Sequence, residues 1–362
     1  MSPPRFSPLA TPRRRWLALA AVLLIGVAGW LARPLYDRPD PLLETPLLAL
    51  EGLQAKPLFF NAAAGPWLRA KRPDLVVPEG ASAFAQAVLE PRLFRQLDRQ
   101  FRFEALLFTG DPSQSRPLLE HLLETKDWAL SYVDHTSLVF RRAGSAGWKT
   151  AELEPVRARF AGASARMRAT MLAQTAAKLV AVRETEAARQ LLDEAQQLDA
   201  RVPEVWSGLA GWHMQRGEYP EACAGAERAL KLDGEHLPAL AVKTHLLFAT
   251  KQFSAAYDLS QRLVARVPDD PNLLFYHAKI AHEAHAYKAE VEALEKIIVQ
   301  AEAAGRPVSG YQMYLGQAHM TLGDGTRAID AFMRVLNDPE LPQDQRDFAR
   351  ESIARIKKRT GL

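Results

Sequence analysis

Cysteine is nearly absent from this chain, which has Cys223 as its single cysteine among 362 residues. One thiol cannot form a disulfide within the chain, and a thiol that lies among alanines in a helical pattern is typically a packing residue. Stability must therefore come from the burial of apolar side chains. Hydrophobic residues make up 48% of the chain, which is enough for two hydrophobic cores.

A surplus of positive charge is missing from most of the chain as well. The formal net charge is +4, but residues 1–33 contain five arginines and no acidic residue, so the remaining residues carry a net charge of −1. Proteins that bind nucleic acid present a basic surface to the phosphates. We therefore do not expect nucleic acid as a partner.

Residue combinations typical of catalysis, or of metal and cofactor binding, are also lacking. Residues 144–147 have the glycines of a phosphate-binding loop without its lysine, and Asp134 and His135 are ordinary turn residues. His282 and His285 lie three residues apart in a predicted helix, but no nearby acid or cysteine supplies a convincing third metal ligand. No nucleophile has a base beside it. We expect a protein without catalysis, cofactor or metal; an enzyme is the less favoured alternative.

One long apolar run lies near the amino end. Residues 16–32 read WLALAAVLLIGVAGWLA and directly follow three consecutive arginines. A membrane-spanning helix needs roughly 17 to 25 apolar residues, and flanking arginines stay in the cytoplasm. We predict a cytoplasmic segment at 1–15, a transmembrane helix at 16–32 that anchors the chain in the inner membrane, and soluble domains in the periplasm. The alternative is a signal peptide cleaved near 27–29; the length of the run and its terminal tryptophans favour the anchor.

After a proline-rich linker at 33–48, residues 49–142 have the pattern of a small α/β domain. Short apolar runs indicate strands, and residues 134–136 join the last two as a hairpin turn. The helix predicted at 113–125 has four leucines on one face, which suits a helix that covers a sheet. The predicted strands are residues 56–61, 74–77, 104–108, 128–133 and 137–141.

The last part of this domain contains a sequence motif that resembles a motif of a known family. The pattern W-x-x-x-Y-x-D-x-x-x-x-V-F-R is formed by Trp128, Tyr132, Asp134, Val139, Phe140 and Arg141. It resembles the end of the extracytoplasmic soluble domain of membrane glycosyltransferases that use polyprenyl-linked sugars. Those domains also often open with a strand that ends in asparagine and is followed by a helix, similar to Phe59-Phe60-Asn61 and Trp67-Leu68.

The chain departs from that family in two ways. Residues 76–81 lack the arginine of the usual Asp-Gly-Arg turn, and the many membrane helices and the acidic first loop that carry catalysis in the family are absent. The resemblance therefore implies a borrowed structural or docking module, and it does not imply transferase activity.

Small and large apolar residues recur every 34 residues in the second half of the chain. A 34-residue period of paired helices is the signature of the tetratricopeptide repeat (TPR), whose helices cross closely at alanine or glycine. In the clearest unit, 203–236, Ala210 and Ala222 take these crossing positions. The residues predicted to fill the space between units are Trp206, Leu209, Tyr219 and Leu230.

We count five repeats within residues 169–342. Glu290 stands where the fourth unit should have alanine, and a slip of four residues at 301–306 precedes the fifth. Residues 143–168 are a linker and leading helix, and residues 343–362 form a capping helix with cations near its end. The predicted fold is an α-helical TPR solenoid that follows a small α/β domain and one transmembrane helix. Helical hairpins without this superhelix are the alternative.

TPR proteins line their inner surface with the first helix of each unit, and the corresponding positions here carry an apolar stripe. The lysine and asparagine set that grips a terminal carboxylate in chaperone-binding TPR proteins is missing, whereas methionine-rich surfaces adapt to varied apolar partners. The predicted partner-binding residues are Met214, His245, Phe248, Phe275, Lys279, His282, Met313 and Met320. The alternative is that these side chains pack inside the solenoid.

These features predict a membrane-anchored scaffold or adaptor that binds a helix or an extended apolar segment of a partner protein. The alternative function, which rests on the resemblance of residues 49–142, is an accessory subunit of cell-surface glycan or exopolysaccharide assembly.

Overall fold

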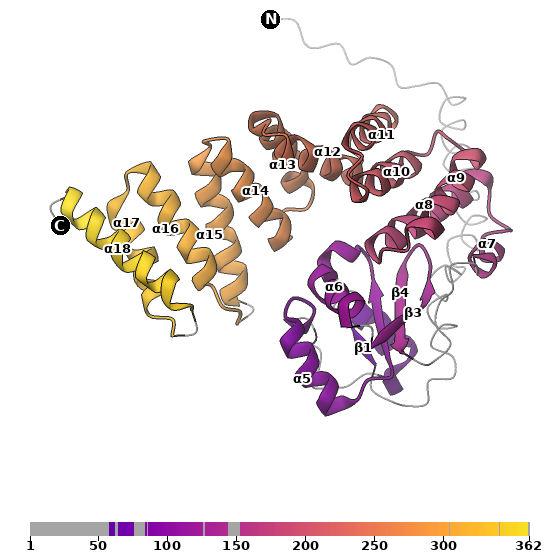
Figure 1. Ribbon diagram of the computed structural model, residues 1–362, viewed down its shortest axis with the longest axis horizontal. Helices are drawn as coiled ribbons and strands as arrows, with labels where there is room; N and C mark the ends of the chain where they lie inside the picture. Colours follow the sequence, from indigo (N-terminus) through magenta and orange to yellow (C-terminus); the bar gives the residue numbers. More distant parts are fainter. Residues whose placement is uncertain are drawn as a thin grey trace, which may run out of the picture. The chain divides into compact units, whose positions relative to one another are not determined.

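The computed structural model describes residues 58–61, 64–75, 84, 86–125, 127–143, 153–303, 305–339 and 341–360 (Figure 1). The predicted cytoplasmic segment, transmembrane helix and linker, at 1–15, 16–32 and 33–48, lie outside these residues. Within the described ranges, no helix combines the length and the apolar character that crossing a membrane requires.

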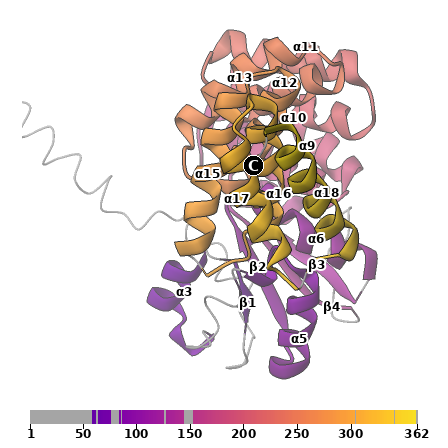
Figure 2. The same cartoon turned by 90° about the vertical axis from the view of Figure 1, so that its left-hand side faces the viewer.

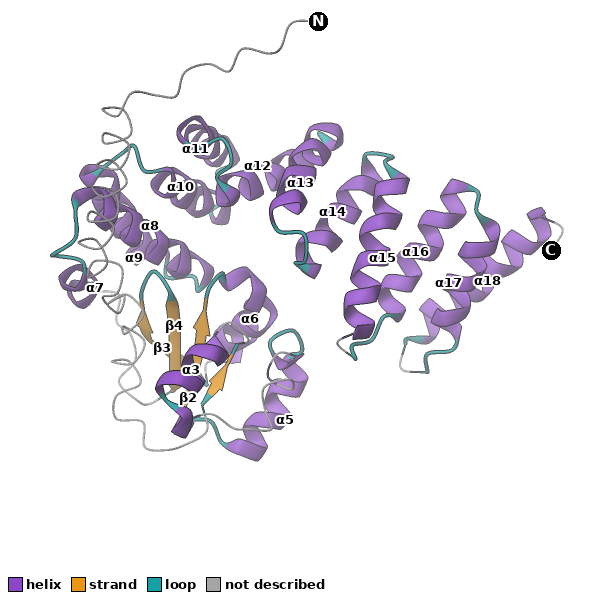
Figure 3. Ribbon diagram, turned by 180° about the vertical axis from the view of Figure 1, so that it is seen from behind, coloured by secondary structure: helices purple, strands orange, loops and turns teal. Residues whose placement is uncertain are grey.

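A four-stranded mixed sheet forms the centre of the amino-terminal described part (Figure 3). Its strands are β1 (Phe59–Phe60), β2 (Ala105–Thr109), β3 (Trp128–Val133) and β4 (Ser137–Arg142), in the spatial order β1-β2-β4-β3. β1 runs parallel to β2, whereas β4 is antiparallel to both of its neighbours. Four of the predicted apolar runs thus contain strands, and the predicted hairpin turn joins β3 to β4.

The strand predicted at 74–77 is wrong where the structure describes it. Asp74 and Leu75 belong to the short 3-10 helix η2 (Pro73–Leu75). Pro73 holds its backbone φ near the value of a helical turn, which favours this conformation over a strand. Leu75 is buried, and its carbonyl oxygen accepts the N–H of Leu58 at 3.2 Å. The apolar side chain of Leu75 is therefore part of the core although the residue lies in a helical turn and not in a strand.

Phenylalanine rings pack between the sheet and its helices. Phe59 of β1 is buried, and its ring centroid lies 5.0 Å from that of Phe84, 5.1 Å from Phe94 and 5.5 Å from Phe103. The flanking elements are α3 (Gly65–Lys71), α5 (Pro91–Phe101), η3 (Pro112–Ser115) and α6 (Arg116–Thr125) (Figure 2). Three of the four leucines predicted to face the core from α6 are buried: Leu118, Leu119 and Leu122.

The described residues after 153 form helices joined by short turns. A short helix, α7 (Glu154–Arg159), precedes five antiparallel pairs. The pairs are α8 (Ala165–Ala181) with α9 (Thr185–Leu198), α10 (Pro203–Gln215) with α11 (Tyr219–Leu232), α12 (Leu237–Ala249) with α13 (Phe253–Arg266), α14 (Pro271–Glu283) with α15 (Tyr287–Ala303), and α16 (Ser309–Leu322) with α17 (Gly325–Leu336). The last helix is α18 (Gln343–Thr360).

The starts of the first helices reproduce the repeat period. α10, α12 and α14 begin at Pro203, Leu237 and Pro271, which are 34 residues apart. α16 begins at Ser309, four residues later than this period requires. Three of these residues lengthen α15, which has 17 residues whereas α11 and α13 have 14, and the fourth lies in the connection between α15 and α16. This part of the chain is a solenoid of helix pairs with the TPR period.

The small residues predicted at the helix crossings are buried there. Ala210 and Ala222 have no exposed surface, and a Cβ atom added to Gly225 would lie 3.0 Å from the carbonyl oxygen of Trp206. α10 and α11 therefore approach too closely for larger side chains. The prediction that Tyr219 fills the space between units is wrong, since 51% of this residue is exposed. Helical side chains tilt toward the amino end, so the first residue of α11 points past the helix.

α18 closes the row of helices against α17. It buries Ala349, Ile353 and Ile356 in a cluster with residues of α16 and α17. Arg355, Lys357 and Lys358 are exposed near its end, where cations interact favourably with the helix dipole.

Candidate functional site

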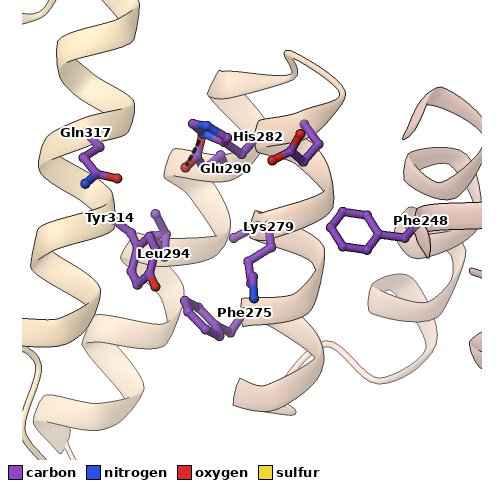
Figure 4. Close-up of a pocket in the computed structure, with 10 residues that line it drawn as sticks. Phe248, Phe275, Lys279, His282, Glu290, Leu294, Tyr314 and Gln317 are labelled. Atoms are coloured by element: carbon purple, nitrogen blue, oxygen red, sulfur yellow. Dashed lines mark hydrogen bonds and ion pairs between the residues drawn. The ribbon is translucent and has the colours of Figure 1, made fainter. Parts of the chain in front are cut away.

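A hollow of about 150 Å³ is lined by residues of four helices (Figure 4). α14 provides the largest share, and α12, α15 and α16 provide the rest. Because α12, α14 and α16 are the first helices of consecutive units, the hollow spans three repeats. We call it the α14 hollow.

Aromatic and aliphatic side chains form one side of the α14 hollow. The ring of Phe275 contacts Tyr314 of α16 edge-on, with 5.2 Å between centroids, and Tyr311 at 5.5 Å. Leu294 of α15 is buried beneath them. Tyr314 is 41% exposed although it is a large apolar ring, so it offers contact area to another molecule.

Phe248 of α12 lines the hollow from the opposite side of α14 (Figure 4). Its ring lies 5.7 Å from that of Tyr276 and 5.6 Å from that of Phe253. Tyr276 also stacks beside His245, with its hydroxyl 3.4 Å from Nδ1, and burial raises the pKa of Tyr276 to about 12. Tyr276 thus contacts both predicted partner-binding residues of α12, His245 and Phe248.

His282 and Glu290 form the polar side of the α14 hollow. His282 Nδ1 lies 3.2 and 3.1 Å from the two carboxylate oxygens of Glu290 (Figure 4). Only 3% of Glu290 is exposed, and this burial raises the pKa of its carboxyl, an effect that His282 partly opposes. The sequence analysis did not anticipate this contact between His282 and an acidic residue. The chain turn between α14 and α15 brings a residue eight positions away into contact.

Two further charged residues line the α14 hollow. The ammonium of Lys279 lies 5.9 Å from the centre of the Phe275 ring, and Glu283 is exposed one helical turn further on. No group of three or more metal-ligating side chains occurs among the described residues. The arrangement offers apolar contact area, two carboxylates, an ammonium and an imidazole.

The structure brings together half of the predicted partner-binding residues. Phe248, Phe275, Lys279 and His282 line the α14 hollow, and His245 lies beside it through its contact with Tyr276. Met214 of α10 is half-buried and does not belong to the lining.

The two predicted methionines of α16 differ in burial. Met313 is 8% exposed, in the core formed with Phe332 of α17 and Ile353 of α18, and Met320 packs against the same core. The prediction of Met313 as a partner-binding residue is wrong, because α17 and α18 cover its side chain. Met320 is partly buried and does not line the α14 hollow. Sequence reasoning missed Tyr314, the residue next to Met313, and Leu294, because both stand at positions that read as internal packing.

The residues that carry the glycosyltransferase resemblance act as structural supports in the α/β domain. Asp134 is fully buried, its Oδ2 accepts the Tyr132 hydroxyl at 2.6 Å, and its Oδ1 accepts the N–H groups of Thr136 and Ser137, both at 2.8 Å. Buried Asn61 joins β1 to β2, because its amide donates to the carbonyl oxygen of Thr109 at 2.7 Å. The motif residues thus stabilise a hairpin turn and a strand end.

No protein-family model matches the sequence, and no curated protein matches it. Among solved structures, the chain is similar to YrrB, described as a TPR protein with an unusual peptide-binding site, at 17% identity, with 50% of this chain and 90% of that chain covered and a TM-score of 0.43. It is also similar to MamA from Desulfovibrio magneticus RS-1, at 22% identity, with 44% and 93% covered and a TM-score of 0.37. A further crystal structure of MamA has 17% identity, coverage of 48% and 95%, and a TM-score of 0.38.

Proposed function

We propose that this chain is a non-enzymatic scaffold that binds a segment of a partner protein in the α14 hollow. The observation that carries this proposal is the placement of Phe248, Phe275 and Tyr314, from the first helices of three consecutive units, around one hollow. Aromatic side chains at the centre of an interface commonly supply most of its binding energy. Since the hollow spans three repeats, a helix or an extended segment that crosses the first helices can reach all three rings.

The size of the hollow supports a side chain of a polypeptide as its occupant. Pockets that enclose small molecules measure roughly 300–1,000 Å³, whereas the α14 hollow measures about 150 Å³. One or two side chains of a segment fill such a volume, and the rest of the segment lies across the helices.

The experiment that tests this function is site-specific photo-crosslinking. A photoreactive phenylalanine derivative at position 314 should capture the partner in membranes of the source cells. The control position is Val299 of α15, which is 65% exposed but does not line the α14 hollow. Equal capture from positions 299 and 314, or capture from 299 alone, would refute the proposal.

The proposed scaffold is anchored in the inner membrane by residues 16–32, with residues 1–15 in the cytoplasm and the folded domains in the periplasm. The apolar run and the three arginines before it support this topology. A reporter that is active only outside the cytoplasm, fused after Leu362, should be active and should sediment with membranes. A soluble product that begins near Trp30 would mean that the segment is a cleaved signal.

The alternative of a role in glycan assembly has less support. Tyr132 and Asp134, which carry the resemblance, bond to each other inside the hairpin. Identification of the protein crosslinked at position 314 separates the two functions, because a glycosyltransferase or a polymer exporter would favour the alternative.

A further inference from the structure

The α14 hollow has an apolar side and an acidic side. Phe275, Leu294 and Tyr314 lie together, while His282 and Glu290 lie together at the other side (Figure 4). A segment that binds there therefore meets an apolar surface and a carboxylate within the same small volume. The chemistry of the carboxylates decides which side chain can fill the polar side.

Glu290 retains acceptor capacity after its contact with His282. An ionised carboxylate has about four acceptor sites, and the contact of Glu290 is with the single Nδ1 atom of His282. No lysine or arginine of the described chain forms an ion pair with Glu290 or with Glu283. A buried carboxylate is costly unless it is paired and hydrogen-bonded, so a cationic donor from a partner would relieve this cost.

The balance of charge around the hollow also favours a cation. The charged and titratable side chains of its lining are Lys279, His282, Glu283, Glu290 and Tyr314. Two of these side chains are carboxylates and one is an ammonium. The side chain of Lys279 is exposed, and its ammonium lies 5.9 Å from the centre of the Phe275 ring. The faces of the aromatic rings also attract a cation.

We propose that the α14 hollow recognises an arginine or lysine side chain of the partner segment, next to an apolar residue. The basic side chain binds the carboxylates of Glu290 and Glu283, and the apolar neighbour packs on Phe275, Leu294 and Tyr314. Arginine suits the site best, because its planar guanidinium donates to carboxylates in a fork and stacks on aromatic rings. This inference rests on the proposed function and names the chemistry of its ligand.

Selection of random short peptides displayed on phage tests the inference. The bait is the full-length chain in detergent, either unchanged or as the double variant Glu283→Gln, Glu290→Gln, which keeps the size of both side chains. The matched control is Glu292→Gln, since Glu292 is an exposed residue of α15 outside the lining. The unchanged chain and the control should select peptides with arginine or lysine beside an apolar residue. The double variant should keep the apolar preference and lose the basic one.

Affinities of one selected peptide provide the quantitative test. Replacement of its basic residue by alanine should weaken binding to the unchanged chain by about tenfold or more, since coupling energies of close charge pairs at interfaces begin near a tenfold effect. The same replacement should have an effect below about twofold on the double variant, because the two changes remove one interaction.

The outcomes separate this inference from the proposed function. Enrichment of acidic residues would mean that Lys279 decides the specificity, and selection of apolar residues without a charge preference would remove the role of both glutamates; either result overturns the inference and leaves the function. If Phe275→Ala and Tyr314→Ala baits select the same peptides as the unchanged chain, the peptides bind elsewhere, and both proposals fail.

Discussion

Lys178 of α8 donates a hydrogen bond from Nζ to the carbonyl oxygen of Gly110, directly after β2, at 2.6 Å. Only 7% of Lys178 is exposed, and burial lowers the pKa of its ammonium, an effect that the charges of Asp111 and Asp134 oppose. In α/β proteins, ligands often bind at the carboxyl ends of the strands. At the end of β2, this position is occupied by a helix of the chain itself, so the first helix pair and the sheet support each other.

Lys178→Met should lower the free energy of unfolding, because the Gly110 carbonyl loses a charged donor while the methionine keeps most of the buried stem. We expect a loss of about 1–3 kcal/mol, the usual cost of leaving one buried polar group unpaired. Denaturant unfolding measures it, with the exposed Lys231→Met as the control. An increase in stability would show that the burial of the charge outweighs the hydrogen bond.

Two glycines of α16 should respond to alanine in opposite directions. A Cβ atom on Gly316 would lie 2.7 Å from the Phe332 ring, so Gly316→Ala forces α16 and α17 apart, and overpacking of this kind typically costs about 1–3 kcal/mol. A Cβ atom on Gly310 meets nothing within 4 Å. Gly310→Ala should be neutral or stabilise by up to about 1 kcal/mol, since alanine favours helices. Thermal unfolding of both variants checks the difference, and equal effects would contradict the packing between these helices.

Ala222→Leu should damage the crossing of α10 and α11, because Ala222 is fully buried where these helices meet. The expected cost is about 1–3 kcal/mol. Glu290→Leu should be milder, because it replaces a buried carboxylate beside the α14 hollow with an apolar side chain. Denaturant midpoints of the two variants make the comparison. Equal losses would mean that the repeat phase used to align Ala222 with Glu290 is incorrect.

Tyr314→Ala and Phe275→Ala should separate binding from stability. Each should weaken partner or peptide binding by about 2 kcal/mol or more, as expected of an aromatic hot spot. Tyr314→Ala should lower the melting temperature less than Phe275→Ala does, because Tyr314 is 41% exposed. Phe275→Ala should also destabilise, by less than the roughly 3–5 kcal/mol of a fully buried phenylalanine, because Phe275 packs against the core of α14, α15 and α16. Unchanged binding in both variants would place the partner elsewhere.

The stability of the solenoid should fall as the pH drops below 6.5. His277 stacks on Tyr257, its Nδ1 lies 2.7 Å from Ser260 Oγ, and burial lowers its pKa below the ordinary value of 6.5. Burial lowers the pKa of His236 as well, although Glu204 and Asp233 oppose the effect. Below pH 6.5, these two histidines therefore bind protons more readily in the unfolded chain than in the folded chain. The contribution of each histidine to the free energy of unfolding is fully present above pH 6.5. It is lost as the pH falls toward the pKa of that histidine in the folded chain, by at most about 1.4 kcal/mol per pH unit.

Denaturant unfolding between pH 7 and pH 5 measures this dependence. His277→Gln should reduce the slope of stability against pH, whereas the exposed His285→Gln should preserve it. An unchanged slope in His277→Gln would assign the loss to other groups.

The sequence was sufficient to predict the helix pairs and most strands. Small residues also stand one period away from Ala210 and Ala222. Because each unit of a solenoid contacts only its neighbours, the spacing of such residues along the chain is enough to predict the helix pairs. Strands β3 and β4 were predictable for a similar reason, since two short apolar runs flank Asp134 and its turn. These features depend on residues that are close in sequence.

The tertiary structure alone decided which side chains reach the α14 hollow. A helix turns by about 100° per residue, so neighbours such as Met313 and Tyr314 face different surroundings, and the position of α18 decides that Met313 is the buried one. The contact of His282 with Glu290 depends on the turn between two helices, and that of Lys178 with Gly110 joins residues 68 positions apart. The period of apolar residues determines that helices pair, whereas the rotation of each helix and its distant neighbours determine which residues remain exposed for a partner.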